Sequence, residues 1–330
     1  MDEDLIAKTE AVVVGVNSVA RLEEVDLPPM NDTRVRVQTL ISGISCGTEA
    51  DYTSGRATYV KRPLIAGYQA VGKVMEVGDR VGNVQAGDLV LTTGGGLWAM
   101  TNVCGGSHAR ESISEAADLV KLNFGAPLFA TASYGVLGAV GHEGISRMKP
   151  EPGNVLIIFG LGMLGQLAGR IGQLLGLRVL GVNRSAWKRE AAETFDAVCP
   201  PDATAIEIAV NSLGVGPAKY AYDTTGSQEI IHLALSSLAS HGELSLGGYY
   251  PGKYEVDYDL CHSRNLSIHN PVGPGNYLGQ VIKYVEQGRL NAEPLIRNRV
   301  KPEEITSFYA DLIHNHSKYL GVIIDWRHPA

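Results

Sequence analysis

Short runs of apolar and β-branched residues, separated by turns, dominate the first third of the chain. Between residues 11 and 120 these runs include AVVVGV, RVRVQTLI, VGKVMEVG and DLVLTT. Glycine and aspartate punctuate them, as in EVGDRVGNVQAGDLV. Such runs, bounded by Gly and Asp, are typical of strands joined by tight connections. We therefore predict a small β-rich barrel or sheet domain in this part of the chain.

The spacing of apolar residues changes near residue 127. APLFATASYGVLGAVG predicts a helix, and GNVLIIFGLGMLGQLAGRIGQLLGLRVLGVNRS predicts a strand, a glycine turn, an amphipathic helix and a strand. Another strand, helix and strand are predicted in AKYAYDTTG, SQEIIHLALSSLAS and GELSLGGYY. Strands that alternate with helices pair in parallel, so we predict an α/β domain with a doubly wound parallel sheet.

After about residue 271 the pattern predicts a helix in NYLGQVIKYVEQG, then a helix and a strand in PEEITSFYADLIHNHSKYLGVIIDW. This segment has too little apolar sequence for a core of its own. We expect it to pack against the β-rich domain. That domain would then be split into residues 1–127 and 272–330, around a second domain of residues 128–271.

Three glycines mark a dinucleotide site. Gly160, Gly162 and Gly165 have GxGxxG spacing, directly after an apolar strand and at the start of a helix. The first glycine permits a tight turn, the second lets the backbone approach a pyrophosphate, and the third lets helix and strand pack closely. The pyrophosphate then meets free N–H groups at the helix start. The predicted cofactor-binding set also contains Met163, Leu164, Thr224 and Gly247.

The end of the second strand predicts which dinucleotide binds. NAD-binding versions of the motif carry an acidic residue there for the ribose 2′-OH, whereas this chain has Asn183, followed by Arg184, Ser185 and Lys188. No carboxylate is present to repel a 2′-phosphate. Hydrogen bonds to a charged group contribute about 1.5–3 kcal/mol each, which favours NADP(H) over NAD(H) by roughly tenfold to a few hundredfold. The alternative is that Arg184 and Lys188 are only solvated charges at a helix start.

Composition narrows the class of partner. The chain has 330 residues, of which 45% are hydrophobic and 19% charged, enough for two folded domains. A formal charge of −7 argues against nucleic acid or an anionic membrane as partner and favours a small molecule. An acidic start, and no run of 18 apolar residues, favour the cytoplasm. The four cysteines have no CxxC pairing, which is typical of reduced thiols.

The chain resembles the medium-chain dehydrogenase/reductase superfamily, and within it the zinc-type alcohol and polyol dehydrogenases, over nearly its whole length. The segments that carry the resemblance are GISCGTEADY, AGYQAVGKVMEVG, VQAGDLV, SHARESISEAADLVKL, GLGMLG and YAYDTTGSQEIIHLALSSLASHGELSLGGYY. It implies a GroES-like catalytic domain, a Rossmann domain that often dimerises edge to edge, and hydride transfer between a nicotinamide and an alcohol or carbonyl compound. A homodimer is therefore expected.

The zinc ligands of that family are incomplete in this chain. Zinc-dependent members use the cysteine that matches Cys46, two residues of a GHE motif, and a further cysteine or acid. Here GHE is replaced by Gly67-Tyr68-Gln69, and GAPLFATASYG contains no Cys, Asp or Glu. Because a catalytic zinc site needs about three protein ligands, we expect no metal. A literal GHE at residues 141–143 is interpreted as a surface coincidence, and only Cys104 stands where members with structural zinc have four cysteines.

Hydroxyl groups are the candidates to replace the metal. By position in the family motifs, Tyr68 stands at a ligand histidine and Thr48 at a proton-relaying hydroxyl, so either one is predicted to donate the proton. Glu49 or Asp51 would pass the proton to solvent, and Cys46 would remain as a thiol wall or weak donor. The alternative for Tyr68 is a packed tyrosine whose hydroxyl binds backbone.

The predicted reaction interconverts a secondary alcohol and its ketone, with a polyol, sugar or cyclitol-like substrate. GISxGTE followed by GY also resembles, more weakly, a subgroup that includes bacteriochlorophyllide dehydrogenases. Two alternatives remain open. One is an NADPH-dependent quinone or enone reductase, and the other is a non-catalytic NADPH-binding protein.

Overall fold

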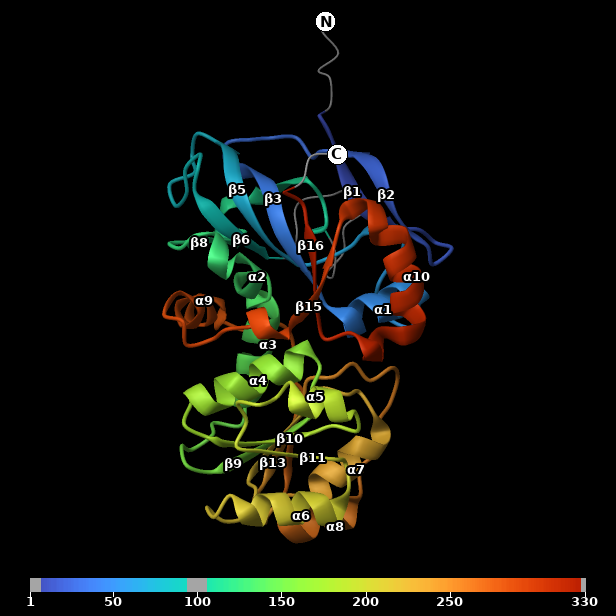
Figure 1. The fold of residues 1–330 in the computed structure, drawn as a ribbon, viewed down its shortest axis with the longest axis vertical. Coiled ribbons are helices and arrows are strands. Elements are labelled where there is room, and N and C mark those ends of the chain that lie inside the picture. The colour runs from blue at the N-terminus through green and yellow to red at the C-terminus, as the bar shows by residue number, and fades with distance from the viewer. Residues whose placement is uncertain (1–6, 94–105, 328–330) are drawn as a thin grey trace, which may run out of the picture. The chain divides into compact units, whose positions relative to one another are not determined.

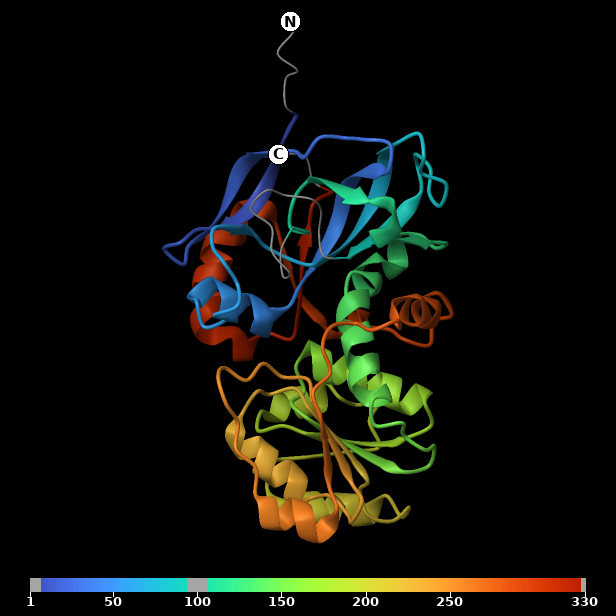
Figure 2. The same cartoon turned by 180° about the vertical axis from the view of Figure 1, so that it is seen from behind.

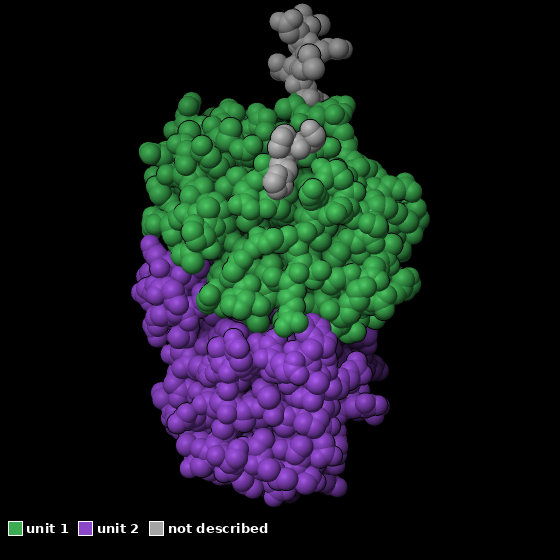
Figure 3. Space-filling model, in the orientation of Figure 1, with its two compact units in different colours: residues 1–136, 291–330 green, residues 137–290 purple. Residues whose placement is uncertain are grey.

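The computed structural model describes residues 7–93 and 106–327 and divides into two compact units. One unit joins residues 1–136 to 291–330, and the other is the single stretch 137–290 (Figure 3). These boundaries lie later in the chain than the expected ones at 127 and 272. The physical reason is that the predicted helix after residue 271 packs within the second unit, where Val281 contacts Gly138.

The first unit is built on two sheets. Within the described residues, a seven-stranded sheet has the order β15-β16-β3-β5-β6-β8, with β7 also pairing with β3, and a three-stranded sheet has the order β2-β1-β4. The strands are β1 (Lys8–Val14), β2 (Ala20–Asp26), β3 (Arg34–Ile44), β4 (Leu64–Ile65), β5 (Gln69–Val77), β6 (Leu89–Thr93), β7 (Glu111–Glu115), β8 (Leu119–Leu122), β15 (Ile296–Val300) and β16 (Gly321–Asp325).

Strand β3 shows why this sheet forms. Val35 and Val37 alternate with partly exposed Arg34 and Arg36, and the two valines pack into a core with Val74 and residues of the neighbouring strands. The end of β3 is buried throughout because β16, far away in sequence, pairs antiparallel with it, as Figures 1 and 2 both show. The predicted packing against the β-rich domain is therefore observed for residues 291–330, whereas the first predicted helix of this segment belongs to the second unit.

The helices of the first unit are mostly short. They are α1 (Cys46–Ser54), η1 (Ala116–Asp118), η2 (Ala126–Leu128), α2 (Phe129–Ala132), η3 (Glu293–Leu295), η4 (Pro302–Glu304), α10 (Ile305–Asn315) and η5 (His316–Lys318), while α3 (Gly135–Ser146) crosses the boundary between the units. The single helix predicted in APLFATASYGVLGAVG is thus broken into η2, α2 and α3. The break lies at Ser133 and Tyr134, where the Tyr134 hydroxyl hydrogen-bonds both backbone groups of Val322 on β16.

The second unit has the predicted α/β architecture. Its sheet has the order β11-β10-β9-β12-β13-β14, and all of its strand pairs are parallel. The strands are β9 (Val155–Phe159), β10 (Arg178–Val182), β11 (Ala197–Cys199), β12 (Tyr220–Asp223), β13 (Glu243–Leu246) and β14 (Ser267–His269). The helices are α4 (Met163–Leu174), α5 (Ala186–Glu190), α6 (Ala203–Ser212), α7 (Gln228–Ser236), α8 (Tyr258–Arg264) and α9 (Leu278–Glu286).

The central strand β9 supplies both cores of this unit. Val155, Ile157 and Phe159 pack into one cluster, whereas Leu156 and Ile158 pack into the other, on the opposite face of the sheet. A strand with both faces covered by helices needs this continuous run of apolar residues. No helix in the described part of the chain is long and apolar enough to cross a membrane.

Candidate functional site

The glycine turn after β9 has the conformation that the motif requires. Gly160 has φ +91°, in the left-handed region, and directly follows the buried strand. Gly162 begins α4 at its N-cap, and a Cβ added there would meet nothing within 4 Å. A Cβ on Gly165, by contrast, would collide with the carbonyl oxygen of Gly160. The helix start is therefore open above Gly162, where a phosphate can approach the N–H groups of Met163 and Leu164.

Two of the predicted cofactor residues support this turn from the neighbouring strands. The Thr224 hydroxyl lies 3.0 Å from the carbonyl oxygen of Phe159 and 3.1 Å from that of Gly160. The N–H of Gly247 donates to the carbonyl oxygen of Asp223 at 2.8 Å. Both residues stand at the carboxyl ends of parallel strands, the edge where dinucleotides bind in this architecture. Thr224 holds the glycine turn in place through its own hydroxyl.

The loop after β10 carries the residues predicted to select the dinucleotide. The Asn183 side-chain oxygen accepts the N–H of Ser185 at 2.8 Å, so the amide braces the loop. Arg189 donates to the carbonyl oxygens of Asn183 and Arg184, at 2.6 and 3.0 Å. The Arg184 side chain is exposed, and within the described ranges its guanidinium makes no hydrogen bond or ion pair. The loop is thus fixed while one cationic group faces solvent.

Lys188 lies differently from Arg184. It is only 8% exposed, and its ammonium lies 5.3 Å from the centre of the Trp187 ring. Its carbonyl oxygen accepts the buried side-chain amide of Gln166 on α4 at 3.2 Å. Lys188 therefore packs α5 against α4, whereas the exposed end of the loop is formed by Arg184 and half-buried Ser185.

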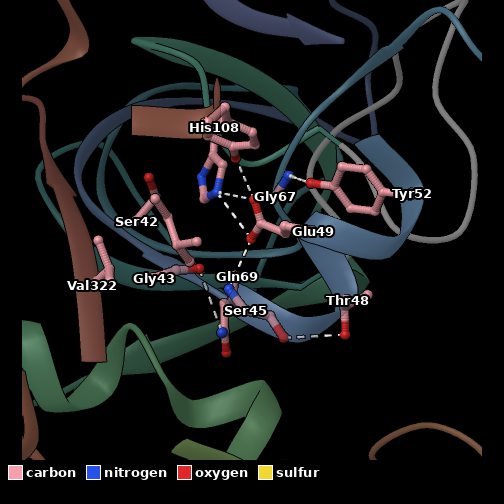
Figure 4. A network of polar contacts seen from close by, with 12 residues as sticks. Ser42, Gly43, Ser45, Thr48, Glu49, Tyr52, Gly67, Gln69, His108 and Val322 are labelled. Carbon is pink, nitrogen blue, oxygen red and sulfur yellow. Dashed lines mark hydrogen bonds and ion pairs between the residues drawn. The ribbon is translucent and has the colours of Figure 1, made fainter. Parts of the chain in front are cut away.

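In the first unit, the start of α1 gathers the predicted catalytic residues. Half-buried Cys46 and Thr48 lie in its first turn, directly after β3. The buried Ser45 hydroxyl donates to the Thr48 hydroxyl oxygen at 3.1 Å (Figure 4). Because that oxygen already accepts a hydrogen bond, the Thr48 proton is available to another acceptor.

Tyr68 and Gln69 occupy different environments although they are adjacent. Gln69 begins β5, is completely buried, and directs its side-chain nitrogen toward the Gly43 carbonyl oxygen, 3.5 Å away (Figure 4). Tyr68 is half-buried. Burial raises the pKa of the Tyr134 phenol well above its usual range, and Cys46, Glu49 and Tyr68 add to the increase. Cys46 and Tyr68 therefore each act electrostatically on the Tyr134 phenol.

The two carboxylates predicted as proton relays differ sharply in exposure. Glu49 is completely buried and accepts hydrogen bonds from Ser45, His108 and Tyr309. Asp51 is half-buried and forms an ion pair with Arg56 at 2.6 Å. Burial raises the pKa of Asp51, against the opposing effect of Arg56 and His316. Glu49 therefore has no direct contact with solvent, whereas Asp51 has.

The sequence of the chain matches two family models. Residues 31–124 match the alcohol dehydrogenase GroES-like domain, and residues 164–286 match the zinc-binding dehydrogenase domain. The chain belongs to the medium-chain zinc-type alcohol dehydrogenase superfamily. Its resemblance to that superfamily, predicted from the motifs, is confirmed, as is the combination of a GroES-like domain with a Rossmann domain.

Similar proteins include several dehydrogenases. "Glucose 1-dehydrogenase 2" of Vulcanisaeta moutnovskia is 27% identical over 277 residues, which cover 74% of this chain and 76% of that protein. "Probable D-xylulose reductase A" of Emericella nidulans is 25% identical over 337 residues, which cover 91% and 92%. The solved structure of a Sinorhizobium meliloti dehydrogenase bound to NADP has a TM-score of 0.83 at 18% identity, covering 97% and 99%. This member of the superfamily is a medium-chain alcohol dehydrogenase-type oxidoreductase.

The family name implies zinc, and the residues of this member do not fit a zinc site. Of the usual ligand positions only Cys46 offers a metal ligand, since Tyr68 and Gln69 replace the histidine and glutamate and α2 contributes none. Among the described residues, no three His, Cys, Asp or Glu side chains come together. One thiolate leaves a tetrahedral ion short of protein ligands. Cys104 lies outside the described residues.

The literal GHE is not at the surface, which corrects the sequence interpretation. His142 and Glu143 lie on α3 and are only 4% and 7% exposed. The His142 ring stacks on Tyr277, with 4.0 Å between ring centroids, and its Nδ1 lies 3.0 Å from the Ser146 hydroxyl. Glu143 forms an ion pair with Arg147 one turn later. Burial lowers the pKa of His142, in keeping with a packed, neutral imidazole.

Sequence reasoning missed the residues that support the site. Ser45, His108, Tyr134 and Tyr309 surround the start of α1, and Arg189 secures the loop after β10. His108 was visible within SHARESISEAADLVKL, but only as part of a family motif. Tyr309 stands 260 positions from Glu49, and no local pattern announces such a contact.

Proposed function

We propose that this protein is a zinc-independent, NADP(H)-dependent oxidoreductase that interconverts a secondary alcohol and its ketone. The observation that carries the proposal is the environment of Tyr68 and Gln69. The Gln69 side chain is directed at the Gly43 carbonyl inside the sheet, and Tyr68 is half-buried. Neither residue is a usual zinc ligand. In this proposal, hydroxyl donors therefore stabilise the negative charge that develops on the substrate oxygen.

Thr48 and Tyr68 are the donors in this proposal. The Thr48 oxygen accepts from Ser45, which orients the hydroxyl and directs its proton away from Ser45. A well-placed donor at a developing oxyanion contributes about 3–4 kcal/mol, so two of them replace much of what a metal ion supplies. Asp51, three residues after Thr48 on the same helix face, is the proton acceptor we propose on the solvent side. Glu49 is sealed from solvent and is not part of that route.

The second unit holds the cofactor in this proposal. The open helix start at Gly162 receives the pyrophosphate, and the carboxyl ends of β9 and β12 lie beside it. When bound, the nicotinamide supplies or accepts the hydride, which is the difficult step of the reaction. The chain supports it by fixing the glycine turn through Thr224.

Selection of NADP(H) rests on the loop after β10. Asn183 is uncharged and is occupied with the N–H of Ser185, so no carboxylate repels a 2′-phosphate. Exposed Arg184 and the N-terminal end of α5 at Ser185 supply positive charge and donors. Lys188 is packed against Trp187, and we assign it a packing role rather than a phosphate contact.

The substrate class follows from the relatives and the donor set. The two relatives named above are described by their names as acting on glucose and D-xylulose. A small polar alcohol or ketone with several hydroxyls, such as a polyol, sugar or cyclitol, is the substrate we propose. A homodimer in the cytoplasm remains our prediction for the assembly and its place, to be tested by light scattering and cell fractionation.

A substrate screen with the purified protein tests the proposal. NADPH oxidation should be observed with sugar or polyol ketones and should persist without bound zinc. Turnover of cyclohexenone or a naphthoquinone alone would indicate the quinone or enone reductase instead. Tight NADPH binding with no turnover of any carbonyl compound would indicate a non-catalytic NADPH-binding protein.

A further inference from the structure

A chain of buried groups joins the start of α1 to the turn that carries Tyr68. The Ser45 N–H donates to the Glu49 carboxylate at 2.8 Å, and the Tyr309 hydroxyl donates to the same carboxylate. Tyr309 and Tyr52 hydrogen-bond through their hydroxyls, and the Tyr52 oxygen accepts the N–H of Gly67 at 3.1 Å. Gly67 directly precedes Tyr68. The network thus ends at the backbone N–H groups of Ser45 and Gly67, which are labelled in Figure 4 and precede Thr48 and Tyr68 in the sequence.

The hydrogen bonds at both ends of this network have a defined direction. A carboxylate only accepts, so Tyr309 donates to Glu49. The Tyr52 oxygen accepts the N–H of Gly67, and the Tyr52 hydroxyl also hydrogen-bonds that of Tyr309. Burial, together with the Glu49 carboxylate, raises the pKa of the Tyr309 phenol, which keeps that proton in place. Removing one hydroxyl breaks the sequence of bonds.

His108 makes a second, shorter connection between the same two turns. Its ring is completely buried, with Nε2 at 3.2 and 3.3 Å from the two Glu49 oxygens. Its backbone N–H donates to the Ala66 carbonyl oxygen at 2.9 Å. Its ring also fills the space where a Cβ of residue 67 would stand, so only glycine, with φ +79°, fits there. The imidazole therefore touches Glu49 on one side and Gly67 on the other.

Burying a carboxylate destabilises a folded protein unless hydrogen bonds compensate for the lost hydration. Ionised groups are seldom fully buried without compensating hydrogen bonds, and the Glu49 carboxylate accepts three. The three donors come from three separate segments, which are the α1 turn, the loop before β7 and α10. A small shift in a donor's position costs a large factor in rate, so rigid spacing of Thr48 and Tyr68 matters to the reaction proposed above.

We propose that Glu49, His108 and Tyr309 are positioning residues that hold the Thr48 and Tyr68 hydroxyls at a fixed separation. The inference rests on the proposed function for its catalytic consequence, but the link between the two turns stands on the contacts alone. None of the three side chains touches substrate in this account, because all are sealed from solvent.

Amide hydrogen exchange tests the link without any substrate. In Tyr309→Phe, the amide of Gly67 should exchange severalfold to about tenfold faster, since Tyr52 loses its partner. Tyr319→Phe is the matched control, because it also removes a tyrosine–carboxylate bond, to Asp311, with no connection to either turn. His108→Leu should loosen both turns, whereas His108→Gln, which keeps a donor toward Glu49, should restore much of the protection. Unchanged exchange at Gly67 in both Tyr309→Phe and His108→Leu would overturn the proposal.

Kinetics test the catalytic consequence on a ketone identified by the screen. Tyr309→Phe should lower kcat roughly tenfold to a hundredfold while the KM for NADPH stays within about twofold. In a Tyr68→Phe background the same change should have little further effect, because the donor it positions is gone. Full additivity of the two losses would overturn the positioning role. If Tyr68→Phe and Thr48→Val both keep full activity, neither residue is the proton donor and the proposed function is wrong. The hydrogen-exchange measurements would still test the structural connection between the two turns. Should Tyr309→Phe not fold, the His108→Leu and His108→Gln pair decides both measurements.

Discussion

The hydroxyl of Ser45 lies 3.1 Å from the hydroxyl oxygen of Thr48 and donates to it. Ser45 is buried, so this bond orients Thr48 from the protein side and leaves its proton for the other side. Tyr68 is half-buried, and both Tyr68 and Cys46 act electrostatically on the Tyr134 phenol. In the zinc-independent reaction proposed above, Thr48 is thus a donor whose orientation the protein already fixes.

Removing the two candidate donors one at a time should identify the proton donor. Whichever of Tyr68→Phe and Thr48→Val removes the true proton donor should lower kcat by roughly 10²–10³-fold, because one donor to the oxyanion is lost. NADPH binding, measured by fluorescence titration, should change little in both variants. Tyr254→Phe, whose hydroxyl binds Asn270 in the other unit, is the control. Wild-type kcat in both variants would contradict catalysis by these hydroxyls.

Cofactor preference should respond to the loop after β10. Arg184→Ala should weaken NADPH binding roughly tenfold to a hundredfold, since about 1.5–3 kcal/mol of charged hydrogen bonding is lost. Asn183→Asp should shift preference toward NADH by adding a carboxylate for the ribose. Arg178→Ala is a matched control, because Arg178 pairs with Asp196 at the opposite end of the same strand. Calorimetric titration with both cofactors measures the ratio, and an unchanged ratio in Arg184→Ala and Asn183→Asp would exclude this loop as the selector.

Two glycines of the turn should separate binding from folding. Gly162→Ala places a methyl group in open space, so stability should stay within about 1 kcal/mol of wild type while NADPH binding falls. Gly165→Ala drives a methyl group into the Gly160 carbonyl and should cost about 3 kcal/mol or more. Denaturant unfolding and cofactor titration measure the pair. Equal cofactor affinity in Gly162→Ala and wild type would contradict the phosphate position.

Metal removal should leave activity intact. The residues at the family's zinc positions supply one thiol, so elemental analysis should find no stoichiometric zinc. Dialysis against a strong chelator should then change kcat by less than about twofold, since no metal step exists to be lost. A zinc-dependent relative assayed alongside shows that the chelator works. Loss of turnover that returns on adding Zn²⁺ would contradict the zinc-independent mechanism.

The stability of the second unit should depend on pH through Asp223. Its carboxylate is completely buried and accepts from Thr225, Gly226 and Tyr250. Burial raises the pKa of Asp223 despite these bonds. A raised pKa means that the folded chain holds this proton more tightly than the unfolded chain does. The contribution of Asp223 therefore improves as pH falls through its folded pKa, and is least favourable at neutral pH.

Tyr250→Phe makes that dependence measurable. At pH 7 the variant should lose about 1.5–3 kcal/mol of unfolding free energy, because a donor to a buried carboxylate is removed. The loss should shrink as the pH is lowered, since a protonated Asp223 needs the donor less. Denaturant unfolding at several pH values measures the difference, and Tyr258→Phe, at a residue that is 71% exposed, provides the exposed-tyrosine control. A loss that is the same at every pH would show that Asp223 does not titrate in this range.

The architecture was predictable because its signals are local. The run Val155–Phe159 and the glycines after it identify a buried strand and a phosphate turn by spacing alone. The same is true of the β-rich first domain, where β-branched runs alternate with Gly and Asp. The break at Ser133 and Tyr134 was not predictable, because it accompanies a hydrogen bond between Tyr134 and Val322, a residue of β16 that lies 188 positions later in the sequence.

The same distinction between local and long-range signals applies to the residues of the candidate site. The roles of Gly160, Gly162 and Gly165 follow from their order in the chain. Glu49 looked like a relay residue from its motif, but it is sealed by His108 and Tyr309, which a motif does not reveal. Lys188 is predicted as a phosphate ligand from its position near the strand end, and the sequence does not show that it is only 8% exposed beside the Trp187 ring. For Glu49, burial and partners far away in the sequence decide the environment, and the neighbouring residues show neither.

The position of β16 near the end of the sequence determines the order in which the two units can fold during synthesis. Residues 137–290 form one uninterrupted unit, so its sheet is complete once those residues have emerged. The other unit is still incomplete at that point. Strand β16, which lies between β3 and β15, and Tyr309, which contacts Glu49, are both synthesised later. A nascent chain stalled before residue 305 would thus carry a folded nucleotide-binding half and an unfinished catalytic half.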